Sequence, residues 1–223
     1  MRREEARPAS RRPRAPRRAP CAAVAAVVAL MLLGGARRAA ADEADFRRFT
    51  DYLWLLGGAA AGFVTHETGH LITDYTLDTH PTFVAVKSGP FPFFAIQPNR
   101  LTPQKRYATA MAGFATQGLY SEIILGVDPW IREHPRPFLK GMLLFHVARS
   151  VGYAVTAFAG TGPPQSDVNA MALGSGWPSW AIGLMVLAPA VLDVYRYFVP
   201  DSGWAPQLSI ASKLTIVGVT FLF

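Results

Sequence analysis

Two histidines and a glutamate form the motif in this chain whose residue types and spacing could carry out chemistry. The sequence His66-Glu67-Thr68-Gly69-His70 separates the two imidazoles by four residues. On a helix, side chains four residues apart lie on one face, so both rings can bind the same Zn²⁺. Glu67 would then face the water that the metal activates and act as the general base. The motif predicts a zinc-dependent hydrolase.

The surroundings of the motif strengthen this prediction. It lies within the apolar stretch 52–73, where ionisable side chains are costly and usually mark a functional site. A structural role is the alternative, in which the two imidazoles and Glu67 satisfy one another between helices. Small residues at 59–62 would let a neighbouring backbone or a substrate approach this helix closely.

A catalytic zinc takes a third protein ligand and keeps one position open for water. Asp167 is the first candidate, because it lies in the Pro-rich break 162–169, where irregular backbone at membrane depth would have to line a cavity. Its alternative role is to cap the short helix expected to start near Val168. Glu122 and His146 are the second and third candidates, although Arg149 could instead pair with Glu122 or contact His146. The third ligand stays open among these three.

Asp74 is a candidate for a supporting role. It follows His70 by four residues and could hold the second nitrogen of that imidazole in place. A helix rises about 1.5 Å per residue, so Asp74 would lie too far along the helix from His66 to share its metal. The alternative is an interfacial aspartate that ends the helix.

Five apolar stretches must position these side chains. The first four approach the roughly 20 residues that a helix needs to cross a bilayer, and the fifth is at the short limit. Gly and Ala clusters suit close helix contact in lipid, and the tryptophans lie mostly near the ends of the stretches, as membrane-interface anchors do. We therefore expect an all-α, multipass transmembrane helical bundle, with a soluble helical bundle as the alternative. The stretches are 52–73, 107–127, 138–160, 177–199 and 208–223.

The connection 74–106 lacks a helical pattern. Two β-rich runs, 82–87 and 91–97, flank Ser88-Gly89-Pro90, which is typical of a turn. Pro92 confines the second run to an edge, because proline donates no hydrogen bond to a sheet. We expect a small β-hairpin inserted after the first helix.

The first 41 residues have the layout of a secretory signal peptide. A basic start, an apolar run over 21–33 and three alanines before Asp42 predict cleavage after Ala41, with an uncleaved anchor as the alternative. Cleavage would place the mature N-terminus outside the cytoplasm. The bias toward Ala, Arg and Pro suggests a bacterial protein, so we expect a bacterial inner-membrane location.

The positive charge of the chain belongs to this leader. The chain has 22 Lys and Arg against 15 Asp and Glu, a net charge of +7. Ten Arg and two Glu give residues 1–41 a charge of +8, which leaves residues 42–223 at −1. With 51% hydrophobic and 17% charged residues, the chain is neither disordered nor nucleic-acid-binding, and its single Cys excludes a disulfide framework. We expect a signal peptide, 1–41, and one membrane domain, 42–223.

These features resemble the site-2 protease group of intramembrane zinc metalloproteases. The resemblance rests on the motif from His66 to His70 within an apolar helix, on the β-rich segment 82–97 and on the small residues of the second helix around 112–115. It implies that His66 and His70 are zinc ligands and that Glu67 is the catalytic base. It also implies that the β-rich segment presents an edge to which an unwound substrate adds as a strand.

The sequence favours an integral membrane zinc metalloprotease that cuts peptide bonds within or beside the bilayer. Glu67 is its expected catalytic residue, and His66, His70 and Asp167 are the expected ligands of Zn²⁺. The expected partners are the lipid bilayer and a peptide or membrane-protein substrate. Two alternatives stay open: a non-enzymatic membrane protein, such as a scaffold or transporter component, and a membrane metal-dependent hydrolase of lipid.

Overall fold

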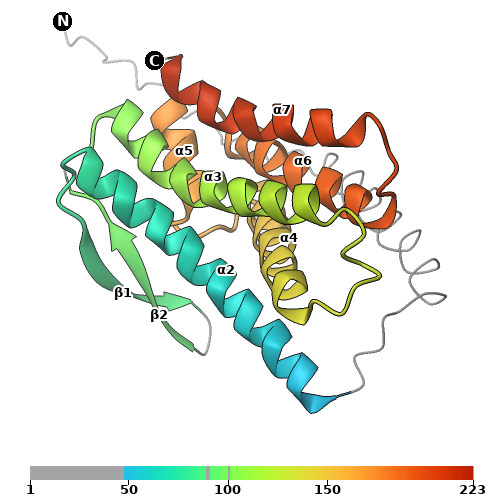
Figure 1. Cartoon of the computed structure of the whole chain (residues 1–223). Helices are drawn as coiled ribbons and strands as arrows, with labels where there is room; N and C mark the ends of the chain where they lie inside the picture. Colours follow the sequence, from blue (N-terminus) through green and yellow to red (C-terminus); the bar gives the residue numbers. More distant parts are fainter. Residues whose placement is uncertain (1–47, 89–90, 100, 223) are drawn as a thin grey trace, which may run out of the picture.

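Helices make up most of the computed structural model, which describes residues 48–88, 91–99 and 101–222 (Figure 1). A two-stranded antiparallel hairpin forms the sheet of this described part. The predicted helical fold with a small β-hairpin after the first helix is confirmed at this level. The predicted signal peptide 1–41 and its cleavage position lie outside the described residues.

Each predicted apolar stretch is helical over most of its length. The short helix expected near Val168 is also present, within the Pro-rich connection between the third and fourth stretches. The fifth stretch departs from the prediction at its end, because the α-helix stops at Gly218 and a 3-10 turn, Val219–Phe221, follows it. The helices are α2 (Phe49–Thr76), α3 (Pro103–Val127), α4 (Pro137–Ala159), α5 (Asp167–Ser175), α6 (Ser179–Phe198) and α7 (Ala205–Gly218).

Residues at the helix ends explain where α3 begins and where α4 ends. The Thr102 hydroxyl caps α3 by accepting a hydrogen bond from the backbone N–H of Lys105, and Pro103 starts the helix, where no backbone N–H is needed. Gly160 ends α4 in the left-handed conformation, with φ of 66°, which glycine adopts without strain. The chain reverses there and leads into α5.

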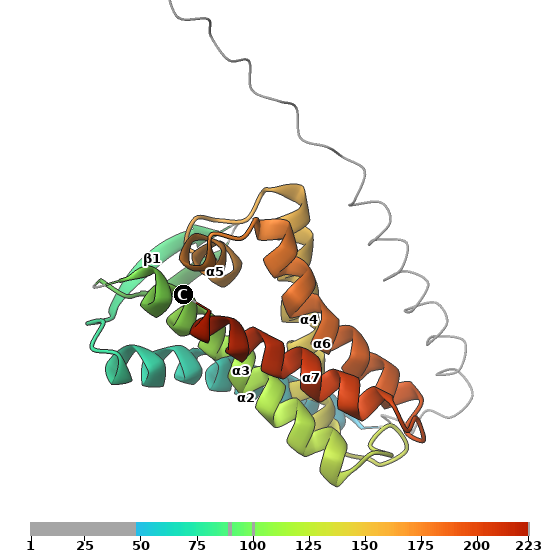
Figure 2. The same cartoon turned by 90° about the horizontal axis from the view of Figure 1, so that it is seen from above.

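Helix α2 packs against α3 on one side and α4 on the other, while α6 packs against α4 and α7 (Figure 1, Figure 2). The α2–α4 contact is close because glycines lie in it. A Cβ on Gly58 would fall 1.8 Å from the carbonyl oxygen of Phe138, and one on Gly141 would fall 2.0 Å from that of Leu55. The small residues of the first apolar stretch therefore permit backbone contact, as their pattern predicts.

The hairpin consists of β1 (Thr82–Ser88) and β2 (Phe91–Gln97), with Thr82 opposite Gln97. Both predicted β-rich runs are strands, and the pairing is antiparallel, so the predicted hairpin is confirmed. Strand β2 contacts α2, and the hairpin lies on the outer side of the bundle beside the C-terminal half of that helix (Figure 1). Residues 96–99, at and after the end of β2, line a cavity together with His70 of α2.

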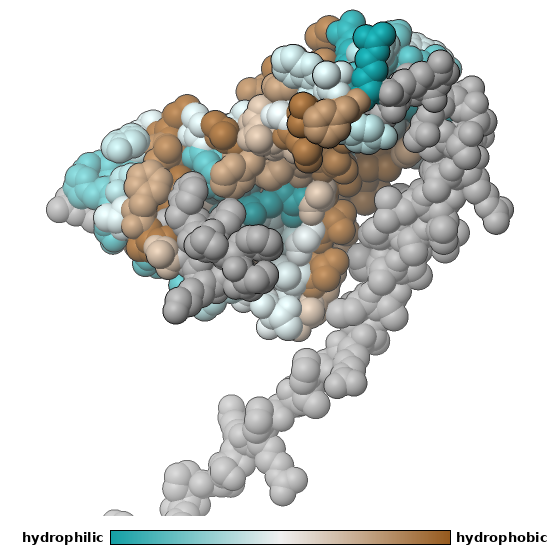
Figure 3. Space-filling model, turned by 90° about the horizontal axis from the view of Figure 1, so that it is seen from below, coloured by the Kyte–Doolittle hydropathy of each residue, from teal (hydrophilic) through white to brown (hydrophobic). Residues whose placement is uncertain are grey.

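Many large apolar side chains are exposed on the outside of the bundle, whereas several ionisable side chains are buried inside it. Figure 3 shows one face, where brown side chains surround a narrow teal strip. Exposed apolar surface of this extent marks a contact with protein or membrane. Helices α4 and α6 are long and apolar enough to cross a membrane, by length and composition. Exposed examples on α2 and α3 are Leu53, Leu56, Val64, Ile72, Leu119 and Ile123, and buried ionisable residues include His66, His70, Asp74, His146, Asp193 and Arg196.

Candidate metal centre

Both histidines of the motif are buried side chains of α2. The four-residue spacing places their rings on one face of the helix, with the centroids 4.7 Å apart and the two Nε2 atoms 3.1 Å apart. The predicted juxtaposition of His66 and His70 is present in the structure.

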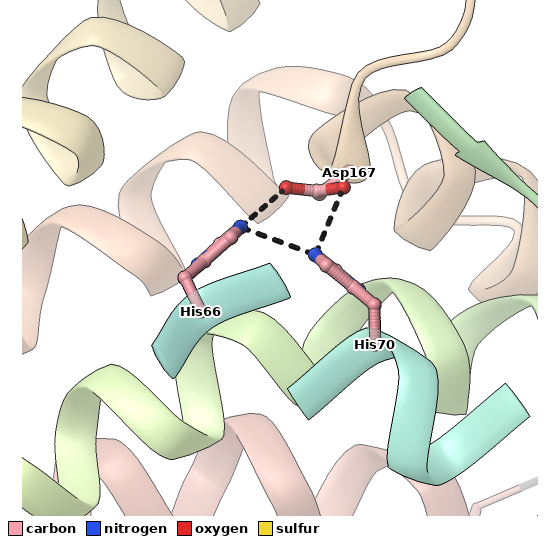
Figure 4. Close-up of side chains that lie close together, drawn as sticks. All are labelled: His66, His70 and Asp167. Atoms are coloured by element: carbon pink, nitrogen blue, oxygen red, sulfur yellow. Dashed lines mark hydrogen bonds and ion pairs between the residues drawn. The ribbon is translucent and has the colours of Figure 1, made fainter. Parts of the chain in front are cut away.

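Asp167, the first residue of α5, reaches this pair from 101 positions along the chain (Figure 4). Its Oδ2 lies 3.2 Å from Nε2 of His66, and its Oδ1 lies 3.5 Å from Nε2 of His70. The two imidazoles and the carboxylate point toward one another, and together they could hold a metal ion. Among the three candidates for the third ligand, Asp167 is the one that joins the histidines.

The separations within this group fit a small, tetrahedrally coordinated cation. Ligand atoms at about 2.0–2.1 Å from a tetrahedral zinc stand roughly 3.3–3.4 Å apart. The two Nε2 atoms lie 3.1 Å apart, Oδ2 of Asp167 lies 3.2 Å from that of His66, and the other carboxylate oxygen, Oδ1, lies 3.5 Å from that of His70. Two imidazole nitrogens and one carboxylate oxygen leave a fourth position for water, which is the ligand set of catalytic rather than structural zinc sites.

The backbone carbonyl of Thr109 on α3 orients the ring of His70. The carbonyl oxygen lies 2.7 Å from Nδ1, and an imidazole N–H is the group that donates to a carbonyl. Nε2 is then the ring nitrogen that faces Asp167 and remains for a metal, and an outer hydrogen bond of this kind is usual for a metal-binding histidine. The predicted role of Asp74 in holding His70 is therefore wrong, because Asp74 instead accepts a 2.7 Å hydrogen bond from the hydroxyl of Thr79.

The ring of His66 packs against a glycine of α3. A Cβ at Gly113 would fall 2.4–2.6 Å from three atoms of this ring, so only glycine leaves the space that the ring occupies. Phe114 and Phe145 also contact the ring edge to face, with centroids 5.7 and 6.3 Å away. The apolar surroundings and the close backbone hold His66 in a single orientation.

Hydrogen bonds around α5 position Asp167. The hydroxyl of Ser166 caps the helix by accepting from the backbone N–H of Asn169, and the Asn169 amide donates a 2.8 Å hydrogen bond to the carbonyl of Pro163. The alternative role of Asp167 as the cap is therefore wrong, and its carboxylate is free to face α2. There it accepts a 2.6 Å hydrogen bond from the Tyr153 hydroxyl.

The carboxyl group of Asp167 is held in its ionised form. Burial opposes ionisation, but the nearby imidazoles of His70 and His66 hold the pKa of this carboxyl well below its ordinary value. The ionised carboxylate is the form that binds a cation.

A cavity of about 520 Å³ opens next to the three ligand candidates. His70 and Asp167 line it together with Glu67, Arg149 and Tyr153. The lining also includes the end of β2 and the residues after it, 96–99, and the Pro-rich connection 163–166. Glu67 thus shares a cavity with the ligand candidates, as the motif predicts for a general base.

Glu122 and His146, the other two candidates for the third ligand, belong to a second polar cluster. His146 Nε2 lies 3.2 Å from a carboxylate oxygen of Asp193, and Glu122 accepts a 2.6 Å hydrogen bond from Arg196. Lys213 joins both carboxylates. Since Arg149 instead lies near Glu67 and Asp167, the predicted pairing of Arg149 with Glu122 and its contact with His146 are wrong.

Sequence reasoning missed two contributors to the site, the Tyr153 hydroxyl and the Thr109 carbonyl. Tyr153 follows Arg149 by four residues, so both lie on one face of α4. The four-residue spacing could have predicted that Tyr153 lies beside Arg149. Neither the residue types nor the spacing predicts that this face of α4 contacts Asp167. The Thr109 carbonyl carries no signal in the sequence, because every residue has one.

Comparisons of the chain with models of protein families, with curated proteins and with solved structures gave no match.

Proposed function

We propose that this chain is an integral membrane zinc metalloprotease that hydrolyses peptide bonds in or near the bilayer. The observation that carries the proposal is the meeting of His66, His70 and Asp167 beside a cavity that Glu67 also lines. The two Nε2 atoms lie 3.1 Å apart, and each lies 3.2–3.5 Å from one oxygen of the Asp167 carboxylate. The resemblance of the motif to that of site-2 proteases supports the same class of activity.

The donor set favours zinc over the other common divalent cations. Imidazole nitrogen suits zinc and its neighbours among the transition metals, whereas Mg²⁺ and Ca²⁺ take mostly oxygen ligands. Separations close to those of a tetrahedron agree with zinc, which is four-coordinate in most protein sites. Bound zinc would supply a Lewis acid that lowers the pKa of a water molecule.

Residues around the cavity would supply the other two requirements of the reaction, proton transfer and the positioning of the ligands. Glu67 accepts the proton of the attacking water and passes it to the leaving amine. Thr109 and Tyr153 hold His70 and Asp167 in place through their hydrogen bonds of 2.7 and 2.6 Å. Positioning of this kind matters for rate, because ligands held by packing and hydrogen bonds need no rearrangement during the reaction.

A membrane location is supported by the distribution of side chains. Helices α4 and α6 have the length and hydropathy of spans, and exposed apolar side chains continue over α2 and α3. The second polar cluster is buried between helices, where charges inside a membrane protein pair with one another. The proposed location is the inner membrane of a bacterium, with the mature N-terminus outside the cytoplasm.

A peptide substrate is supported by the sheet edge near the cavity. Ile96 and Gln97 at the end of β2 line the cavity, and β2 has only β1 as a neighbour in the hairpin. An extended peptide that adds to such an edge gains main-chain hydrogen bonds whatever its side chains are. This mode suits an enzyme that must first unwind a helical substrate.

The test begins with zinc content. The full chain, purified in detergent, should hold about one zinc per chain, and His66→Ala should remove it. Glu67→Gln should keep the zinc but lower the cleavage of quenched fluorescent peptides in proteoliposomes by at least about 100-fold. Glu133→Gln, which changes an exposed glutamate in the α3–α4 connection, is the matched control.

Two results would refute the proposal. One is a wild-type protein that holds no zinc although the motif is intact. The other is a Glu67→Gln protein that retains full turnover, as a scaffold or transporter role predicts. Hydrolysis of labelled phospholipid in the same vesicles, without peptide cleavage, would instead assign the site to lipid hydrolysis.

A further inference from the structure

Arg149 of α4 lies between the two carboxylates of the cavity. Its Nη2 is 3.8 Å from Oδ2 of Asp167 and 3.9 Å from Oε1 of Glu67. The side chain of Arg149 is about one quarter exposed, and it lines the cavity with both carboxylates. A fixed positive charge therefore stands next to the proposed base and to one ligand of the metal.

The guanidinium is oriented by packing more than by hydrogen bonds. Its Cζ lies 4.4 Å from the centre of the Tyr153 ring, a cation–π contact that holds the group against the face of the ring. The separations of 3.8 and 3.9 Å exceed a hydrogen bond, and Nε is buried with no hydrogen-bond partner among the residues that the structure describes. The N–H groups of Arg149 are thus held beside the cavity, and they make no hydrogen bond to the carboxylates of Glu67 and Asp167.

A simple counter-ion for Glu67 and Asp167 would be expected to form short, bidentate contacts, which are the strongest that arginine makes with a carboxylate. Arg149 does not do so with either side chain. Free donors with a fixed orientation suit a different task, which is to bind an oxygen that gains negative charge during the reaction.

We propose that Arg149 binds the carbonyl oxygen of the substrate and stabilises the tetrahedral oxyanion, with Tyr153 as the residue that positions it. This inference rests on the proposed hydrolytic function. As water bonds to the carbonyl carbon, its proton passes to Glu67 and the carbonyl π electrons move to the oxygen, where Arg149 donates to it. When the carbon–nitrogen bond breaks, the electrons re-form the carbonyl and the amine takes the proton from Glu67. The substrate is an acyl compound whose carbonyl oxygen enters the cavity on the side of α4.

The test compares two small probes on the zinc-loaded full chain in detergent, by isothermal titration calorimetry. Phenylphosphonate is a tetrahedral anion that mimics the oxyanion, whereas acetohydroxamate is a planar chelator that depends on the metal. Arg149→Gln should weaken phenylphosphonate binding by about 10- to 100-fold, the range for a lost charge-assisted hydrogen bond, and leave acetohydroxamate binding within about threefold. Arg149→Lys should restore part of the loss.

Arg106→Gln is the matched control, because it removes the same charge from another wall of the same cavity. It should change phenylphosphonate binding by less than about threefold. Equal losses in both variants would overturn the inference, since only the net charge would then matter, as would unchanged binding in Arg149→Gln.

Zinc content separates the possible failures. If Arg149→Gln loses zinc, Arg149→Lys becomes the deciding variant. A lysine ammonium lacks the fixed, planar set of donors of the guanidinium, so phenylphosphonate binding should still fall, and phenylphosphonate binding like that of wild type would overturn the inference. A wild-type chain without zinc would refute the proposed function itself and this role with it, whereas intact zinc with unchanged phenylphosphonate binding refutes the role of Arg149 alone.

Discussion

Gly113 is the position where adding one methyl group should damage the metal centre most. This glycine of α3 faces the ring of His66, and it is not among the residues that line the cavity. Gly113→Ala therefore tests whether the backbone of α3, and not only the ligands, determines the geometry of the site.

The size of the effect follows from the distances at this contact. The added Cβ would lie 2.4 Å from Cε1 of His66 and 2.6 Å from both ring nitrogens, whereas an ordinary contact begins near 3.4 Å. The ring must therefore retreat by about 1 Å, which is half of a zinc–nitrogen bond of about 2.0–2.1 Å. Helices α2 and α3 are in close contact near this position, since a Cβ at Gly69 would fall 2.8 Å from the carbonyl oxygen of Ala112. Moving the two helices apart to make room for the methyl group would lose that contact. We expect the zinc dissociation constant to rise by about 100-fold, the upper end for disturbing a residue that orients a ligand.

The assay is competition for zinc between the detergent-purified protein and a chelator of known affinity. Gly126→Ala is the matched control, because it lies on the same helix and no heavy atom of the described residues lies within 4 Å of its added Cβ. Circular dichroism checks that both variants stay helical, since overpacking can also cost about 1–3 kcal/mol of stability. If folded Gly113→Ala protein binds zinc within about threefold of Gly126→Ala, the reasoning about His66 is refuted.

Three further predictions concern the outer parts of the site and the bundle. Tyr153→Phe should weaken zinc binding by about tenfold, because it removes the 2.6 Å hydrogen bond to Asp167, and chelator competition measures this. Gly141→Ala should lower the free energy of unfolding by about 1–3 kcal/mol, because its Cβ would fall 2.0 Å from a carbonyl oxygen of α2, and thermal unfolding in detergent measures this. Lys213→Met should cost about 3–5 kcal/mol in the same unfolding assay, because it removes the 2.7 Å partner of the Asp193 carboxylate and leaves Glu122 and Asp193 to share one arginine, Arg196.

Each of these predictions has its own control. Tyr75→Phe changes an exposed tyrosine and should leave zinc binding unchanged. Gly152→Ala on α4 has open space around the added Cβ among the described residues, so its stability should match wild type. Glu122→Gln combined with Lys213→Met should recover part of the loss, because it removes the negative charge that the cluster has in excess once Lys213 is gone, while Arg196 remains for Asp193. Additive losses in that pair would contradict the charge-pairing explanation.

The helices and the hairpin could largely be predicted from the sequence because their signals are local. Apolar stretches of about 20 residues, the cap at Thr102 and the turn after β1 each lie within a few residues of the element that they define. The length and composition of the stretches did not decide how many cross a membrane, since α4 and α6 alone, within the described residues, meet the criterion for a span. Hydropathy averages over a helix, and the polar side chains inside α2 and α3 lower it.

The same division holds for the site. The sequence by itself determined that His66 and His70 lie on one face of a helix with Glu67 next to them, because residues four apart in an α-helix are one above the other on the same face. Only the tertiary structure decided the rest: that Asp167 and not Glu122 joins the pair, that Thr109 and not Asp74 holds His70, and that Arg149 faces the cavity. These contacts join different helices, and their positions depend on how closely backbones pack at glycines such as Gly113 and Gly141. Such packing is a property of the whole bundle, which no spacing within one segment encodes.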